Sequence, residues 1–165
     1  MLLKNLINSP AIGIKKIQIK GLAINSKEVK KDFIFFAIKG QKSNGEEFIN
    51  EAVKRGASVI ICAKNCKFKR KKIVVIKTKN IRHLLSEVAS KFYKSKPKNI
   101  IAVTGTNGKT SVADLFYQIL SLNKIPAASI GTLGVKYKNK IIKTDPTSPD
   151  TISIHKYLQL LKNNN

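Results

Sequence analysis

The chain has 165 residues, with a hydrophobic content of 42% and a charged content of 25%, both ordinary for a globular protein. Its net charge of +23 could indicate nucleic-acid binding, but lysines are spread along nearly every segment without an aromatic-rich basic stripe. We therefore expect no nucleic-acid partner, and no apolar run is long enough to cross a membrane. The N-terminus lacks the features of a secretory signal, and Cys62 and Cys66 have no second pair for a zinc site. A cytoplasmic, reduced protein is the simplest expectation.

The first part of the chain, residues 1–96, is predicted to be a small α/β domain. Short runs rich in apolar and β-branched residues predict strands at 17–24, 33–38, 58–63 and 73–78. Two helices are predicted, over residues 45–55 and from Asn80 to about Phe92. The second has the clearest amphipathic stripe of the chain, formed by Ile81, Leu84, Leu85, Val88 and Phe92. Strands that alternate with helices indicate an α/β layer arrangement.

The second part, residues 97–165, follows a seam marked by Pro97. Residues 99–130 predict a β-α-β unit, in which a buried strand at 100–103 precedes a helix and a second strand. A short extended stretch is predicted at 135–143 and a loop at 144–150. A final amphipathic helix is predicted from about residue 151 onwards. A parallel sheet normally has more than the two strands predicted here, and it is covered on both faces. This part would leave apolar sheet edges uncovered and is therefore expected to be an incomplete domain, one that folds against another partner or belongs to a longer chain.

The segment Thr104–Ser111 reads T-G-T-N-G-K-T-S and lies between the predicted strand and helix. Glycines let backbone N–H groups approach phosphate oxygens, and the helix N-terminus adds unpaired donors. The strict pattern G-x-x-x-x-G-K-[ST] fails, because its first glycine would fall at Val103. A glycine turn with an exposed lysine is the alternative, but the strand and helix favour phosphate binding. The predicted nucleotide-binding residues are Gly105, Thr106, Asn107, Gly108, Lys109, Thr110 and Ser111.

Several motifs, in order, resemble those of the Mur ligases, which add amino acids to the peptidoglycan precursor. The loop G-T-N-G-K-T is similar to the ATP loop of that family and of its relative folylpolyglutamate synthase. Residues 25–40 and 44–57 resemble stretches of the family's first domain. Residues 131–134 and 147–150 resemble later motifs and are most like those of the third-step ligases. The resemblance implies ATP and Mg²⁺ as cofactors, with Lys109 as the catalytic residue on the β/γ-phosphates and Thr110 on the metal.

The same resemblance implies the substrates and their site. They would be UDP-N-acetylmuramoyl-L-alanyl-D-glutamate and a diamino acid, either diaminopimelate or lysine, joined through an acyl phosphate. The residues implied for precursor binding are Ile24, Ser26, Gln41, Thr147 and Ser148. The chain departs from the family pattern at four positions, where it has Asn25, Lys27, Asn44 and Ser148 in place of Asp, Arg, Asp and Thr.

Length is the largest departure from the family pattern. A Mur ligase continues through the rest of its ATPase domain and a third domain, which carry a Mg²⁺-binding glutamate and a modified lysine. The implied partner of this chain is thus the missing C-terminal part of the same enzyme, and we expect no ligase turnover without it. Two alternatives stay open: a non-catalytic nucleotide- or precursor-binding module and, supported only by charge, a basic nucleic-acid-binding protein.

Overall fold

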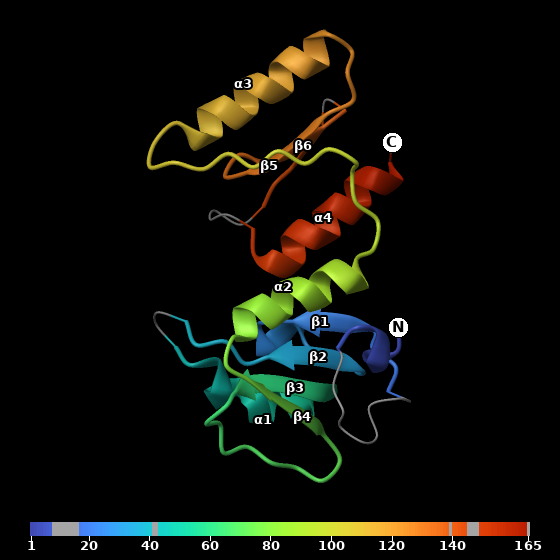
Figure 1. Ribbon diagram of the computed structural model, residues 1–165, viewed down its shortest axis with the longest axis vertical. Helices are drawn as coiled ribbons and strands as arrows, with labels where there is room; N and C mark the ends of the chain where they lie inside the picture. The colour runs from blue at the N-terminus through green and yellow to red at the C-terminus, as the bar shows by residue number, and fades with distance from the viewer. Residues whose placement is uncertain (8–16, 41–42, 139, 145–148, 165) are drawn as a thin grey trace. The chain divides into compact units, whose positions relative to one another are not determined.

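The computed structural model describes residues 1–7, 17–40, 43–138, 140–144 and 149–164 (Figure 1). The chain forms two compact units, unit 1 (Met1–Phe92) and unit 2 (Tyr93–Asn165), and each has its own sheet. The domain boundary between residues 96 and 97 stays a prediction. No helix in the described part of the chain is long and apolar enough to cross a membrane.

Unit 1 is built on a parallel sheet with the strand order β1-β2-β3-β4. The strands are β1 (Gly21–Ala23), β2 (Phe33–Phe36), β3 (Ala57–Ala63) and β4 (Val74–Thr78). All four lie within or beside the predicted runs, although β1 covers only part of residues 17–24. The longest strand, β3, has no exposed residue, which explains its continuous apolar sequence.

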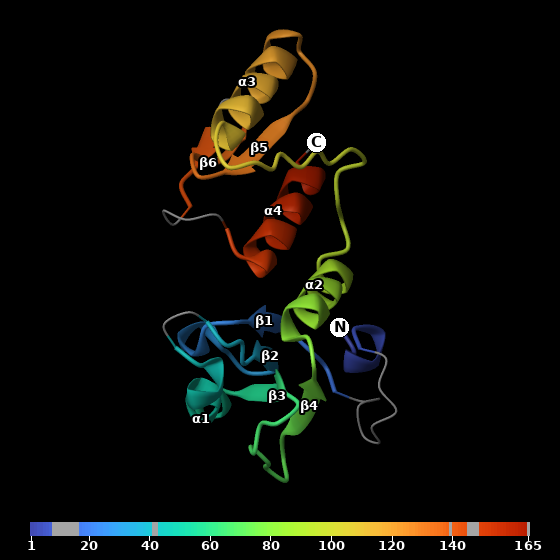
Figure 2. The same cartoon turned by 60° about the vertical axis from the view of Figure 1, so that its left-hand side comes forward.

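The two helices of unit 1, α1 (Ile49–Lys54) and α2 (Ile81–Phe92), lie on opposite sides of this sheet (Figures 1 and 2). Successive strand residues point to opposite faces. Phe35 and Ile60 accordingly join the core cluster that contains Ile49 and Ala52 of α1. The predicted amphipathic stripe of α2 is partly confirmed, since Leu85 and Val88 are buried.

The described part of unit 1 also contains three short 3-10 turns: η1 (Leu3–Asn5), η3 (Ser26–Glu28) and η4 (Gly45–Phe48). Leu3 and Leu6, in and beside η1, are fully buried. Lys91 Nζ of α2 donates to the carbonyl oxygen of Leu6 at 3.3 Å. The N-terminal segment therefore contributes to the core, although the predicted elements begin only at about residue 17.

Unit 2 contains two helices and a small antiparallel sheet with the order β5-β6-β7. Its elements are α3 (Lys109–Leu122), β5 (Ala128–Gly131), β6 (Gly134–Tyr137), β7 (Lys140–Ile142) and α4 (Thr151–Asn163). Helix α3 packs along β5, as both views show (Figures 1 and 2). Lys136 Nζ of β6 lies 2.5 Å from Asp114 Oδ1 of α3, and this ion pair lowers the pKa of the Asp114 carboxyl.

The α/β fold class is confirmed, but two details of the predicted β-α-β unit are wrong. Residues 100–103 form no strand, and Ile100 and Ile101 are exposed. A strand needs a neighbour for its backbone hydrogen bonds, and among the described residues none pairs with this segment. The second predicted strand exists as β5, but it pairs antiparallel with β6 through the turn at Gly131–Gly134.

Unit 2 leaves much of its apolar surface in water. Among its described residues only Val135 and Leu161 are buried hydrophobic side chains. Helical spacing puts Val112, Leu115, Phe116, Ile119 and Leu120 on one face of α3, yet the first four of these side chains are exposed and Leu120 is half-buried. The core of the described chain therefore lies almost entirely in unit 1.

Candidate phosphate-binding and precursor-binding sites

The glycines of the loop allow the turn that starts α3. Gly105 and Gly108 have φ angles of 150° and 75°, in the region that favours glycine. Gly108 is the N-cap of α3 and offers no side-chain cap to the first turn of the helix. No atom lies within 4 Å of the position a Cβ would take at Gly108. Backbone donors at an open, positive helix end suit an anion.

Lys109, the first residue of α3, bends back over its own loop. Its Nζ donates to the carbonyl oxygens of Gly105 and, at 3.0 Å, of Thr106. Phosphate oxygens are charged acceptors and form stronger bonds with an ammonium group than neutral carbonyls do.

A second hydroxyl lies beside the predicted metal ligand. Thr110 Oγ1 is 3.0 Å from Thr132 Oγ1, and Thr132 directly follows β5. Sequence reasoning noted the G-T-L-G stretch but gave Thr132 no role. Its position just after a strand and beside a glycine is the signal that could have identified it. The loop as a whole fits a nucleotide with Mg²⁺, because it offers an ammonium group, backbone donors and hard oxygen ligands.

The described residues contain no group of three or more His, Cys, Asp or Glu side chains that could hold a metal ion. Mg²⁺ in nucleotide sites commonly keeps phosphate and water oxygens as its main ligands.

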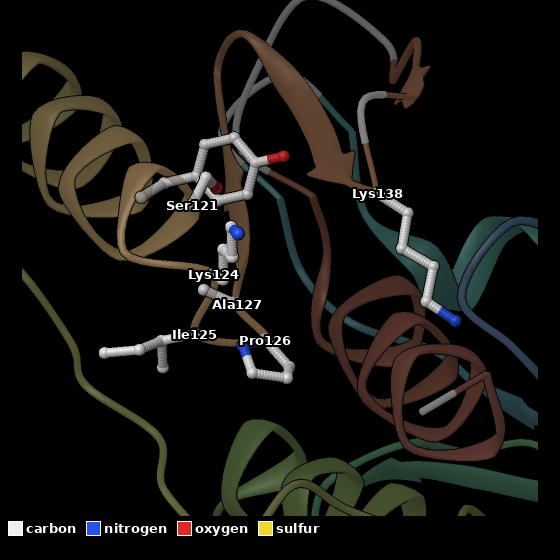
Figure 3. Close-up of a pocket in the computed structure, with 7 residues that line it drawn as sticks. Ser121, Lys124, Ile125, Pro126, Ala127 and Lys138 are labelled. Carbon is white, nitrogen blue, oxygen red and sulfur yellow. The ribbon is translucent and has the colours of Figure 1, made fainter.

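A hollow of about 280 Å³ lies at the other end of α3 and is distinct from the loop (Figure 3). Its walls come from Tyr117, Ser121, Lys124, Ile125, Pro126, Ala127 and Lys138. The Lys138 ammonium donates to the carbonyl of Asn164. Because α3 rises about 1.5 Å per residue, this hollow is roughly 20 Å from the phosphate loop, and we assign it no part in nucleotide binding.

The predicted precursor-binding residues Ile24 and Ser26 lie just after β1, in unit 1. Ile24 is half-buried and Ser26 is 5% exposed. Ser26 Oγ donates to Glu51 Oε2 of α1 at 2.7 Å, and Glu51 Oε1 accepts from Arg55 Nε at 3.0 Å. These two donors, Ser26 first, hold the pKa of the Glu51 carboxyl below its ordinary range. Sequence reasoning did not identify Glu51 or Arg55, whose i,i+4 spacing on a helix was the available signal.

Two departures from the family pattern keep a clear structural function. Asn25 Oδ1 accepts from the backbone N–H of Lys27 at 3.0 Å, and Asn44 Oδ1 accepts from that of Glu46 at 3.2 Å. Asparagine and aspartate are comparable N-caps. Both substitutions therefore preserve the turns η3 and η4.

The remaining predicted site residues, Gln41, Thr147 and Ser148, lie outside the described residues. The structure brings Ile24 and Ser26 together in unit 1. It gathers the loop from Gly105 to Ser111, with Thr132, in unit 2. The binding roles of all these side chains stay predictions.

Comparison with known proteins places both units in one family. The sequence model described as "Mur ligase family, catalytic domain" matches residues 18–93, and "Mur ligase middle domain" matches residues 103–165. A parallel α/β unit followed by a glycine loop at a helix N-terminus is thus matched by sequence models of one class of ligases. The chain is a member of the Mur ligase family and contains N-terminal and middle-domain sequence.

The sequence relatives carry one name, UDP-N-acetylmuramoyl-L-alanyl-D-glutamate--2,6-diaminopimelate ligase. The relative from Rickettsia prowazekii is 43% identical over 86% of this chain, and that from Rickettsia conorii is 49% identical over 72%. A second ligase of that name from Clostridium acetobutylicum is 34% identical over 96%. The chain spans 30%, 24% and 34% of the lengths of these relatives, respectively.

Two solved structures are similar to the chain. A structure of a diaminopimelate ligase of the same name covers 99% of the chain with a TM-score of 0.83 and 21% identity, so it supports the fold. The MurF ligase from Thermotoga maritima in complex with ADP covers 66% with a TM-score of 0.51 and 27% identity. The chain covers 34% and 25% of these two structures.

Proposed function

We propose that this chain supplies the precursor-binding domain and the phosphate loop of an ATP-dependent ligase of peptidoglycan synthesis. The reaction would join diaminopimelate to UDP-N-acetylmuramoyl-L-alanyl-D-glutamate, as the names of the sequence relatives state for those proteins. Diaminopimelate, and not lysine, is the added residue we favour on this ground. ATP and a nucleotide-linked precursor are cytoplasmic metabolites, so we place this function in the cytoplasm.

One observation carries the proposal: the glycine loop opens directly onto the N-terminus of α3, where Lys109 and Thr110 stand in the first turn. Three kinds of donor would hold a triphosphate there: the loop amides, the α3 dipole and the Lys109 ammonium. The hydroxyl of Thr110, with Thr132 beside it, would bind Mg²⁺. The metal would neutralise the charge of the phosphates during transfer to a carboxylate.

In this assignment each residue has a limited task. Lys109 exchanges the carbonyl oxygens of Gly105 and Thr106 for the β- and γ-phosphate oxygens and so orients the terminal phosphate. Ile24 and Ser26 belong to the loop that would receive the nucleotide end of the precursor. Full turnover needs the sequence that the longer relatives have beyond this part. Phosphoryl transfer depends on positioning and charge neutralisation by many groups, so we expect binding by this chain without measurable ligation.

Calorimetric titration of the chain with ATP tests the proposal, with and without Mg²⁺. We expect Lys109→Ala to weaken ATP binding by at least tenfold, because a charge-assisted bond to phosphate is lost. Lys124→Ala is the matched control, since this residue lies at the far end of α3, and it should bind ATP like the parent chain. Equal affinity of the parent and Lys109→Ala would refute the assignment of the loop.

A further inference from the structure

The two cysteines of the chain, Cys62 and Cys66, lie together at the carboxyl end of β3. Both are free thiols, and both belong to the core cluster that contains residues of α1. We propose that they form a redox modification site, in which a hydroperoxide oxidises the two thiols to an intramolecular disulfide. This site does not involve the residues assigned to ATP or to the precursor, and its test needs neither ligand.

The backbone directs both side chains to the same side of the sheet. Residues two apart in a strand point to the same face, so Cys62 follows Ile60 into the cluster around α1. A tight turn comes next, in which the Cys66 N–H donates to the carbonyl oxygen of Ala63 at 3.1 Å. The two residues between them are exposed at the tip of the turn. The chain thus returns Cys66 to the cluster that Cys62 already occupies.

The two thiols also interact with each other. Burial, and after it a hydrogen bond with the Cys66 thiol, raises the pKa of the Cys62 thiol to about 12. Lys77, which pairs with Cys62 in the sheet, donates from Nζ to the carbonyl oxygen of Cys66 at 2.6 Å. Cysteines that lie far apart cannot be bridged without backbone movement. Here the turn and Lys77 hold the second sulfur beside the strand that carries the first.

The order of reaction follows from exposure. Cys66 is 5% exposed and Cys62 is 0% exposed. The neighbours of Cys66 in sequence are exposed on both sides, whereas Cys62 lies inside a strand without an exposed residue. A brief local opening of the turn would admit a hydroperoxide to Cys66 and leave Cys62 covered. Cys66 is therefore the thiol that the oxidant meets first, and Cys62 is the resolving thiol.

The chemistry is a two-electron oxidation in two steps. The Cys66 thiolate attacks one oxygen of hydrogen peroxide; an S–O bond forms, the O–O bond breaks, and the other oxygen takes up a proton and leaves as water. The Cys62 sulfur then attacks the sulfenic sulfur; the S–S bond forms, the S–O bond breaks, and a second water leaves. Two thiols and one hydrogen peroxide thus give one disulfide and two water molecules.

The disulfide would act locally. It would close only the short ring of residues 62–66, and such a small ring constrains the unfolded chain little. Within that ring, the Ala63 N–H donates to Glu46 Oε1 at 3.3 Å, and Glu46 belongs to η4. The turn that oxidation would rigidify is therefore joined directly to η4.

Mass spectrometry of the native chain after treatment with hydrogen peroxide tests the proposal. Free thiols are alkylated before the chain is unfolded and digested. We expect the parent chain to lose the mass of two hydrogen atoms. Trypsin cuts after Lys64, so the disulfide should leave the peptides of Cys62 and Cys66 joined, and dithiothreitol should separate them. The chain has no other cysteine, and oxidation of its single methionine, Met1, would add oxygen to a different peptide.

Two matched alanine variants define the role of each thiol. In Cys62→Ala, Cys66 has no resolving partner, so its sulfenic acid should persist and react with dimedone. In Cys66→Ala, the covered Cys62 should react with peroxide about tenfold more slowly than Cys66 does in Cys62→Ala. Circular dichroism checks that both variants keep the fold, and the result for the parent chain does not depend on them.

Several results would overturn the proposal. Sulfinic acid on Cys66 with Cys62 still reduced would show that the two sulfurs do not reach each other. Disulfides found only in cross-linked dimers, or only in urea, would show that the native turn does not form the bond, and so would two thiols that peroxide leaves unchanged. A faster reaction of Cys62 than of Cys66 would overturn the assigned order. None of these results bears on ATP or precursor binding.

Discussion

Phe36 of β2 and Phe116 of α3 offer a direct comparison of the two units. Phe36 is fully buried in unit 1, whereas Phe116 of unit 2 is 45% exposed. The two substitutions Phe36→Ala and Phe116→Ala remove the same atoms. Their effects on the free energy of unfolding should therefore differ mainly through burial.

The magnitudes follow from the exposed fractions. A fully buried phenylalanine removes about 200 Å² from water, and at about 25 cal/mol per Å² this area corresponds to ~5 kcal/mol. Measured Phe→Ala changes in cores are about 3–5 kcal/mol, which we expect for Phe36. Phe116 keeps only about 110 Å² out of water on the same scale, which corresponds to a loss of ~3 kcal/mol at most. A domain the size of unit 1 is stable by only about 5–14 kcal/mol.

Native-state hydrogen exchange measured by mass spectrometry is the suitable assay, because it reports the opening of each unit separately. Phe36→Ala should speed exchange of the slowest β3 amides by roughly 150-fold to several thousandfold. Phe116→Ala should leave these amides unchanged and speed those of α3 by about 150-fold at most. The reasoning is refuted if Phe116→Ala affects α3 as strongly as Phe36→Ala affects β3.

Two further predictions concern unit 1. Gly56→Ala should lower the free energy of unfolding by about 1–3 kcal/mol in urea titrations, because φ is 107° and the new Cβ would lie 2.8 Å from Lys31 Cα; an unchanged midpoint would contradict this. Burial raises the pKa of the Cys62 thiol to about 12, so iodoacetamide should label Cys62 slowly at neutral pH and faster as the pH rises toward that value. Rapid labelling of native protein at pH 7 would show that β3 is less protected than described.

The sequence predicted well those elements whose signal is local. The stripe of α2 and the β-branched run of β3 follow from spacing alone, because side-chain direction repeats with the period of the element. The segment 100–103 shows the limit of such reasoning. Its apolar residues are typical of a buried strand, but a strand also needs a partner, and no described segment supplies one.

The candidate sites likewise contain some residues that local sequence identifies and others that only folding brings together. The phosphate loop could be identified from contiguous residues, because its glycines, lysine and threonine act within one turn. The contacts of Ser26 could not, because Glu51 lies 25 residues further along and meets Ser26 only after α1 packs on the sheet. Likewise Thr132 reaches Thr110 only because α3 packs along β5.

The distribution of the core along the chain has a consequence for synthesis. Every strand of the parallel sheet and both of its covering helices lie within the first 92 residues. Domains fold as units during translation, which proceeds at about 5–20 residues per second. The remaining residues of the chain then take roughly 4–15 s to make. Unit 1 can therefore complete its core on the ribosome while the rest of unit 2 is still being made.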